Sequence, residues 1–226
     1  VFEKEKITSL LIVTDQGIID HGLIKTVEET CKKYCVEYTI YSGVKPNPTV
    51  ENVECGLHLY QNNHCQAIIA IGGGSSMDTA KAIGALMTNG GKCEDWYEGN
   101  LKKQIAPLIC IPTTCGTGSE VTHESIVNNT KTLEKDCIWG PQNSVKTAII
   151  DSEMIDHLPG KILGSTGMDA LTHAIEGYIT KAAWEMTDMF HLKAIEIIAR
   201  SLRDAVAGKP EGRDGMALGQ YVAGMG

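Results

Sequence analysis

The sequence predicts an α/β domain with a parallel sheet over residues 1–157, followed by an all-helical domain over residues 158–226. Three observations support this fold class. Short apolar runs alternate with helix-like segments up to about residue 151. One of these runs ends at three consecutive glycines, where a helical pattern starts at once. From Leu158 onward the pattern is helical throughout. Such alternation implies right-handed crossovers and ligands at the carboxyl ends of the strands.

Length and composition limit the class of protein. The 226 residues leave room for one large domain, or one domain and part of a second. A net charge of −8 argues against nonspecific binding to nucleic acid or to an anionic membrane. No apolar segment approaches the ~20 residues that span a bilayer, and the N-terminus lacks the order of a signal peptide. Eight dispersed cysteines without a CxxC pair indicate reduced thiols, so we expect a cytoplasmic protein.

The first half of the chain alternates between strands and helices. Ser9–Thr14 is predicted to form a buried strand, and strand-like alternation returns at Val36–Tyr41. Helical spacing covers Leu23–Cys35 and Val50–Asn63, and the two prolines in Val44–Thr49 predict a rigid loop. These segments form a β-α-β-loop-α series that leads into the glycine-ended strand.

Asp15 follows the first strand directly. At this position of a nucleotide-binding fold, a carboxylate can accept both ribose hydroxyls and repel a 2′-phosphate, which selects NAD over NADP. The alternative is an N-cap for a helix that starts near Ile18. Local sequence does not separate the two roles.

The glycine run is a candidate phosphate site. Ala67–Ile71 predicts a buried strand, and residues 72–74 permit a sharp turn and a close backbone approach by a ligand. Ser75 or Ser76 is expected to cap the following helix, with Asp78 in its first turn. The amides and positive dipole end of that helix suit an anion. The alternative is a tight turn without a ligand, because the run matches neither GxGxxG nor a Walker loop.

A second candidate loop follows the strand Pro107–Ile111, in the stretch PTTCGTGSEVT. Its hydroxyls on Thr113, Thr114 and Thr117 could close over the same ligand, or could only cap the next element. Further on, Val121–Val127 and Thr147–Asp151 are expected to be strands, with a hairpin or excursion between them.

Asp169 and His173 lie four residues apart on a predicted helix and therefore share a face. A carboxylate and an imidazole on adjacent turns can bind one divalent ion such as iron or zinc. The spacing by itself is also compatible with an ordinary helix-start aspartate and a neutral buried histidine. The other histidines show no obvious pairing with this helix.

Three motifs in this order, GGGSSMDTAKA, PTTCGTGSEVT and GMDALTHAIEGY, resemble the iron-dependent (group III) alcohol dehydrogenase family. The resemblance covers essentially the whole chain. It implies a Rossmann-like dinucleotide-binding domain, then an all-helical metal domain. It also implies NAD and Fe²⁺, or Zn²⁺, as cofactors and a short-chain alcohol or diol, foremost 1,2-propanediol with lactaldehyde, as the substrate pair. We expect a homodimer that binds neither nucleic acid nor membrane.

The resemblance assigns roles to individual residues. The implied NAD contacts are Asp15, Asn47, Gly73, Gly74, Ser75, Asp78, Thr113, Thr114, Thr117 and Lys135. Asp169 and His173 match the first two metal ligands. Family members carry two more histidine ligands and a relay histidine further along, so we expect this chain to be a fragment with most of the helical domain missing. Other alcohol substrates, and a non-catalytic nucleotide-binding module, remain alternative functions.

Overall fold

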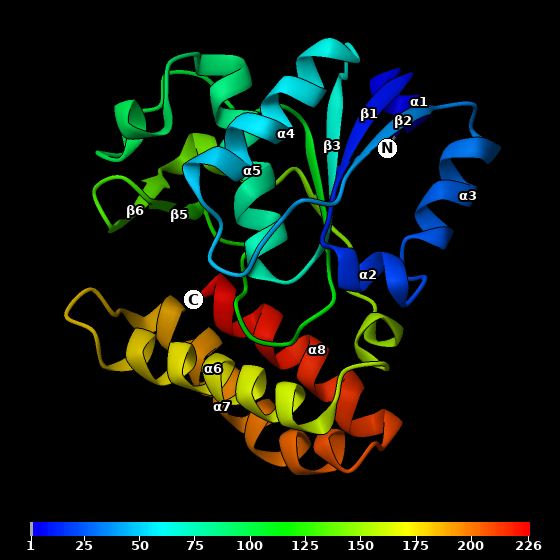
Figure 1. The fold of residues 1–226 in the computed structure, drawn as a ribbon. Coiled ribbons are helices and arrows are strands. Elements are labelled where there is room, and N and C mark those ends of the chain that lie inside the picture. Colours follow the sequence, from blue (N-terminus) through cyan, green and yellow to red (C-terminus); the bar gives the residue numbers. More distant parts are fainter. Residues whose placement is uncertain (1) are drawn as a thin grey trace. The chain divides into compact units, whose positions relative to one another are not determined.

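The backbone of residues 2–226 and the side chains from residue 4 onward are described by a computed structural model (Figure 1). Contacts divide the chain into two units. The first contains residues up to Ile111 together with His123–Ala148, and the second contains Pro112–Thr122 together with Ile149–Gly226. The loop of residues 112–122, which we expected in the first domain, therefore packs with the helical part.

The central sheet of the first unit has the strand order β2-β1-β3-β4-β7. Its strands are β1 (Ser9–Val13), β2 (Glu37–Tyr41), β3 (Ala67–Gly72), β4 (Leu108–Pro112) and β7 (Thr147–Ala148). Strand β1 pairs in parallel with both β2 and β3, and β4 pairs in parallel with β7. The predicted parallel α/β class is confirmed.

The helices of this unit cover the sheet as the alternation predicts. They are α1 (Phe2–Glu5), α2 (Gln16–Asp20), α3 (Lys25–Lys33), α4 (Val50–Asn62) and α5 (Gly74–Asn89). Leu11 and Val13 of β1 stand beside Ile68 and Ala70 of β3, and all four belong to the core cluster that includes residues of α4 and α5. Alternate residues of a strand point to opposite faces, so β1 and β3, which are buried from Leu10 and Ala67 onward, are apolar on both faces.

A separate antiparallel hairpin follows, made of β5 (Glu124–Asn129) and β6 (Glu134–Trp139). We expected a strand from Val121, whereas β5 begins three residues later. Short 3₁₀ turns lie at η1 (Cys93–Trp96), η2 (Pro141–Asn143) and η3 (Ser152–Ile155). The half-exposed ring of Trp139 at the end of β6 packs over Gly99, where any Cβ would overlap the indole. Gly99 has a φ of +71°, which a glycine adopts without strain.

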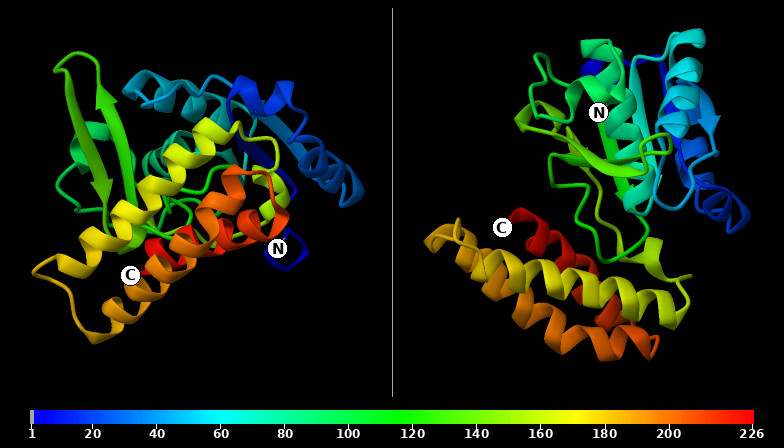
Figure 2. Two further views of the ribbon diagram at one scale, coloured as in Figure 1. Left: turned by 90° about the horizontal axis from the view of Figure 1, so that it is seen from below. Right: turned by 60° about the vertical axis from the view of Figure 1, so that its left-hand side comes forward.

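Three long helices form most of the second unit: α6 (Gly160–Ile179), α7 (Glu185–Val206) and α8 (Pro210–Met225). They pack side by side in both views of Figure 2 around a core that includes Leu163, Ala174 and Ile198. The helical character predicted from Leu158 onward is confirmed. The boundary after residue 157 stays a prediction.

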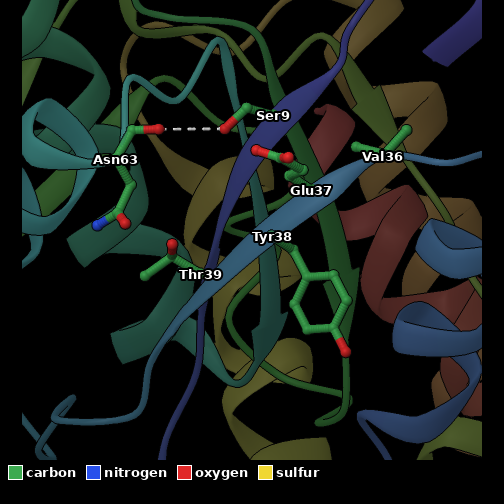
Figure 3. Close-up of a pocket in the computed structure, with 6 residues that line it drawn as sticks. All are labelled: Ser9, Val36, Glu37, Tyr38, Thr39 and Asn63. Atoms are coloured by element: carbon green, nitrogen blue, oxygen red, sulfur yellow. Dashed lines mark hydrogen bonds between the residues drawn. The ribbon is translucent and has the colours of Figure 1, made fainter.

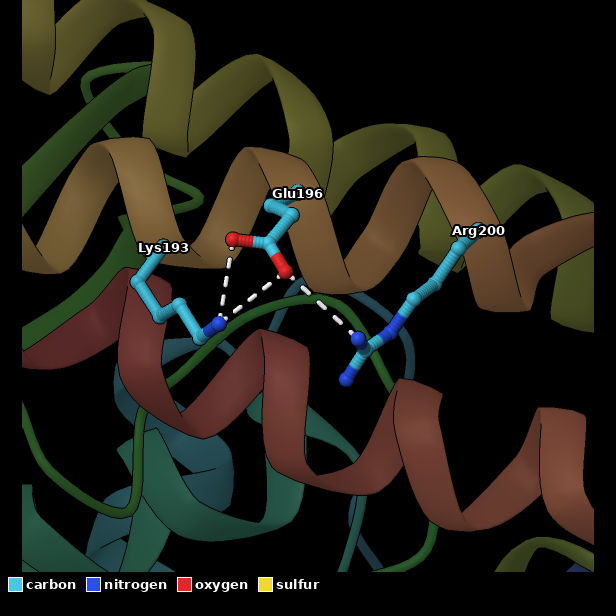
Figure 4. A network of polar contacts seen from close by, with 3 residues as sticks. All are labelled: Lys193, Glu196 and Arg200. Carbon is cyan, nitrogen blue, oxygen red and sulfur yellow. Dashed lines mark hydrogen bonds and ion pairs between the residues drawn. The ribbon is translucent and has the colours of Figure 1, made fainter.

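The outer surface of α7 carries a small ion-pair network (Figure 4). Glu196 accepts from Lys193 at 3.0 Å and from Arg200 at 3.5 Å. All three side chains are more than half exposed, so the network contributes little stability and marks no site. Over the described part of the chain, no helix combines the length and the apolar character needed to cross a bilayer.

Candidate nucleotide and metal sites

The turn between β3 and α5 requires glycine at position 72. Gly72 has a φ of +151°, and a Cβ there would overlap the hydroxyl of Ser76. Gly73 is the N-cap of α5 with an extended backbone, and it makes no side-chain capping bond. The expected cap by Ser75 or Ser76 is therefore wrong. The chain makes its bend on the glycines, which puts both serines inside the helix.

The first turn of α5 offers polar groups that suit an anion. The amides of Ser76 and Met77 already bond to the Gly73 carbonyl, at 3.1 and 3.3 Å. The N–H groups at the very start of a helix, here those of Gly74 and Ser75, have no acceptor within the helix. The Ser76 hydroxyl is buried and has no partner among the described residues. Together with the helix dipole, these groups make the turn a candidate phosphate site.

Asp15 lies beside this turn. Its Oδ1 accepts from the Ile18 amide at 3.2 Å, so it is the N-cap of α2. Its Oδ2 lies 3.6 Å from the position that a Cβ on Gly72 would occupy. One carboxylate oxygen thus caps the helix while the other faces the glycine turn. The sequence left two roles open for Asp15, capping α2 and binding a ribose. This geometry makes the two roles compatible in one side chain.

Asn47 and Lys135 are linked through Asn128 of the hairpin. The Asn47 carbonyl accepts from the Asn128 side chain at 3.0 Å, and Asn128 is the register partner of Lys135 across β5 and β6. Asn47 itself has a φ of +56°, a conformation that asparagine tolerates better than most residues. Lys135 is exposed. Both predicted contacts therefore lie near the loop that follows β2.

Asp78 has a different position from the expected one. It lies beyond the first turn of α5, because the helix already starts at Gly74. Its Oδ2 accepts from the Ile126 amide at 3.2 Å, and its main-chain carbonyl accepts from the Ser125 hydroxyl at 2.7 Å. The geometry assigns it to hairpin binding, and its contact with NAD stays a prediction.

The threonine-rich loop belongs to the second unit. The Thr117 hydroxyl accepts from the Ser119 amide at 3.3 Å, which is the turn-capping alternative. The Thr114 hydroxyl is buried without a partner among the described residues, so it is better placed to bind a ligand. Burial raises the pKa of the neighbouring Cys115 thiol, which therefore stays protonated and makes a poor nucleophile or metal ligand.

Asp169 and His173 form the candidate metal pair on α6. The Asp169 Oδ1 lies 3.8 Å from the His173 Nε2, and both side chains are nearly half exposed. A Cβ on Gly116 would stand 2.7 Å from the Thr166 carbonyl and 3.1 Å from the Asp169 Oδ2, so the glycine lets the loop approach α6 closely beside this carboxylate. Within residues 2–226 as described, no cluster of three or more possible ligands exists. The pair fits part of a divalent-metal site and needs further ligands.

Sequence patterns alone did not single out Lys81, and they favoured an ordinary core or surface position for His191. Lys81 on α5 is completely buried and donates to the Glu124 carbonyl at 2.8 Å. His191 on α7 is also buried, and its Nδ1 has no partner among the described residues. The signal for Lys81 was available, because a lysine three residues after Asp78 stands among alanines on the apolar side of the helix.

A cavity of about 360 Å³ lies elsewhere, at the amino ends of β1 and β2 (Figure 3). Its lining comprises Ser9, Val36, Glu37, Tyr38, Thr39 and Asn63. None of these is a predicted site residue, and ligands of parallel sheets bind at the opposite, carboxyl ends.

Comparisons with known proteins match almost the whole chain. The family profile described as iron-containing alcohol dehydrogenase matches residues 1–152, and its C-terminal counterpart matches residues 164–226. Lactaldehyde reductase of Escherichia coli is 44% identical over 96% of this chain and 57% of that protein. Alcohol dehydrogenase 4 of Schizosaccharomyces pombe is 42% identical over 95% of this chain and 52% of that protein.

Solved structures show the same fold. A 1,3-propanediol oxidoreductase superposes with a TM-score of 0.96 at 36% identity, over 99% of this chain and 59% of that one. Sulfoacetaldehyde reductase from Bifidobacterium kashiwanohense in complex with NAD⁺ superposes with a TM-score of 0.91 at 31% identity, over 99% of this chain and 60% of that one. The chain therefore spans a little over half the length of these relatives.

Proposed function

Because the chain belongs to the iron-containing alcohol dehydrogenase family, we propose that it is the nucleotide-binding and partial metal-binding portion of an NAD-dependent alcohol dehydrogenase. The observation that carries this proposal is the glycine turn, whose helix N-terminus and adjacent Asp15 carboxylate provide complementary groups for a diphosphate and a ribose. The chain covers 57% of the lactaldehyde reductase, so the activity belongs to the proposal.

The proposed reaction interconverts a short-chain alcohol or diol with its aldehyde. Lactaldehyde and 1,2-propanediol are the first pair to test, given the 44% identity to a lactaldehyde reductase. Matches to proteins named for methanol, choline and 1,3-propanediol make other alcohols the alternative. We further propose a cytoplasmic homodimer, in keeping with the expectation from the sequence.

In the proposed mechanism, the residues of this chain bind the nucleotide and orient it. The amides at the start of α5 hold the diphosphate, and Asp15 fixes the adenosine ribose and disfavours a 2′-phosphate. Asp169 and His173 would contribute a carboxylate oxygen and an imidazole nitrogen to Fe²⁺, or to Zn²⁺, which also accepts this donor pair. When bound, the metal supplies Lewis acidity to the alcohol oxygen, and the hydride chemistry belongs to the nicotinamide.

The test uses the full-length protein. NADH and NADPH are titrated separately by nucleotide fluorescence, and NAD reduction by 1,2-propanediol is followed with and without added Fe²⁺. We expect tighter binding of NADH and metal-dependent reduction. Absence of metal-dependent NAD reduction with every short alcohol would remove the dehydrogenase function. NADH binding without turnover would instead support the non-catalytic nucleotide-binding alternative.

A further inference from the structure

Helix α5 is joined to strand β5 by three hydrogen bonds. Lys81 Nζ donates to the Glu124 carbonyl at 2.8 Å, and the Ser125 hydroxyl donates to the Asp78 carbonyl at 2.7 Å. The Ile126 amide donates to the Asp78 carboxylate at 3.2 Å. Asp78 and Lys81 are three residues apart and share one face of α5. We call these contacts the clamp.

We propose that the clamp positions the β5–β6 hairpin for nucleotide binding, with Lys81 as its principal positioning residue. This inference rests on the proposed NAD-binding function of the glycine turn. It adds that the hairpin completes the site, and that Asp78 and Lys81 act through the hairpin.

Lys81 lies in the protein interior, where its ammonium group needs polar partners. The side chains of Lys81 and Ser125 are both 0% exposed. Removing an ammonium group from water is costly, so a buried lysine needs polar partners for its charge. A methionine or leucine would fill the same volume without that cost. The lysine instead delivers a donor to a main-chain carbonyl of β5, which fixes where that strand lies on the helix.

The far end of the hairpin is fastened to a second predicted nucleotide-binding segment. The Asn128 amide donates to the Pro48 carbonyl at 2.8 Å, and the Asn128 side chain donates to the Asn47 carbonyl at 3.0 Å. Lys135 lies directly across the hairpin from Asn128. A displacement of β5 on α5 must therefore move Lys135 and disturb Asn47, both predicted NAD contacts.

The test compares Lys81→Met with wild type in the full-length protein. Methionine fills a similar volume but leaves the Glu124 carbonyl without its donor, so we expect a modest fall in the melting temperature. We expect the Kd for NADH to rise roughly tenfold, because binding must then also restore the hairpin position that the clamp holds in the wild type. Hydrogen exchange of the β5 amides, measured without nucleotide, should become faster. Lys103→Met, which changes an exposed lysine, is the matched control and should leave both readouts unchanged.

Each outcome decides the proposal. A Kd for NADH within twofold of wild type, or unchanged exchange in β5, would overturn it, and so would a lower melting temperature with unchanged NADH affinity. If Lys81→Met does not fold, Ser125→Ala removes a different bond of the clamp and should weaken NADH binding in the same direction; unchanged binding would overturn the proposal. Failure of wild type to bind NADH would be seen before any variant is made, and would refute the proposed function together with this inference.

Discussion

Replacing Asp15 with serine should change nucleotide preference without unfolding α2. The carboxylate has two tasks: Oδ1 caps the helix through the Ile18 amide, and Oδ2 faces the glycine turn. Serine is about as good an N-cap as aspartate, because its hydroxyl can accept the same amide. It cannot offer a charged acceptor to a ribose. Asp15→Ser therefore separates the two tasks.

The expected magnitude follows from the lost contacts. A hydrogen bond to a charged group contributes about 1.5–3 kcal/mol, so the Kd for NADH should rise by about 10- to 150-fold. Affinity for NADPH should rise, because the carboxylate no longer repels a 2′-phosphate. The melting temperature should stay close to that of wild type. Asp15→Gly should relax the preference in the same way, since glycine at an N-cap costs only a few tenths of a kcal/mol.

The assay is a pair of fluorescence titrations, one with NADH and one with NADPH, on each variant of the full-length protein. Asp20→Ser is the control, because Asp20 is an exposed aspartate at the other end of the same short helix. An unchanged ratio of the two dissociation constants in Asp15→Ser would refute the nucleotide-selecting role of Asp15. Its only remaining role would then be that of N-cap of α2.

Three further changes test other parts of the chain. His173→Ala should abolish metal binding, measured by elemental analysis, and a retained stoichiometric metal would exclude this ligand. Gly177→Ala should lower the free energy of unfolding by about 1–3 kcal/mol in a denaturant titration, because its Cβ would overlap the buried His191 ring; full stability would contradict that packing. The hydrogen bond from the Thr130 hydroxyl is the largest cause that lowers the pKa of Glu51 from 4.5 to about 2. The ionised Glu51 carboxylate therefore contributes its full stabilisation of the fold above pH 4.5, and this contribution is lost as the pH falls toward 2. Relative to Glu51→Gln, the wild-type stability advantage should disappear over that interval, and a constant difference would refute it.

Continuous apolar runs made the sheet and its order of elements predictable. Ser9–Val13 and Ala67–Gly72 form strands almost where the sequence places them, because a strand buried on both faces tolerates little else. Capping was less predictable. A serine next to a glycine run suggests a hydroxyl cap, yet the backbone of Gly73 occupies the N-cap position. The choice depends on where the bend falls, which is a tertiary property.

The least predictable contacts join distant segments. Asp78 is a predicted NAD contact because of its place after the glycines, and no local pattern reveals that its carboxylate also accepts from the amide of Ile126, 48 residues further on. The hairpin itself left only a weak signal, and no local pattern reveals that its strand is fastened to α5. The separate assignment of the Thr113–Thr117 loop to the helical unit likewise depends on packing against α6, where Cys115 contacts Thr166 at 3.4 Å.

The position of Trp139 over Gly99 gives the protein a native optical reporter. Indole emission is sensitive to solvent, and this half-exposed ring ends the strand opposite β5. A shift of the hairpin would change its hydration, and therefore its emission wavelength and its accessibility to a collisional quencher such as iodide. Hairpin motion can thus be followed in real time without an added label, by comparing this emission with that of a Trp139→Phe variant.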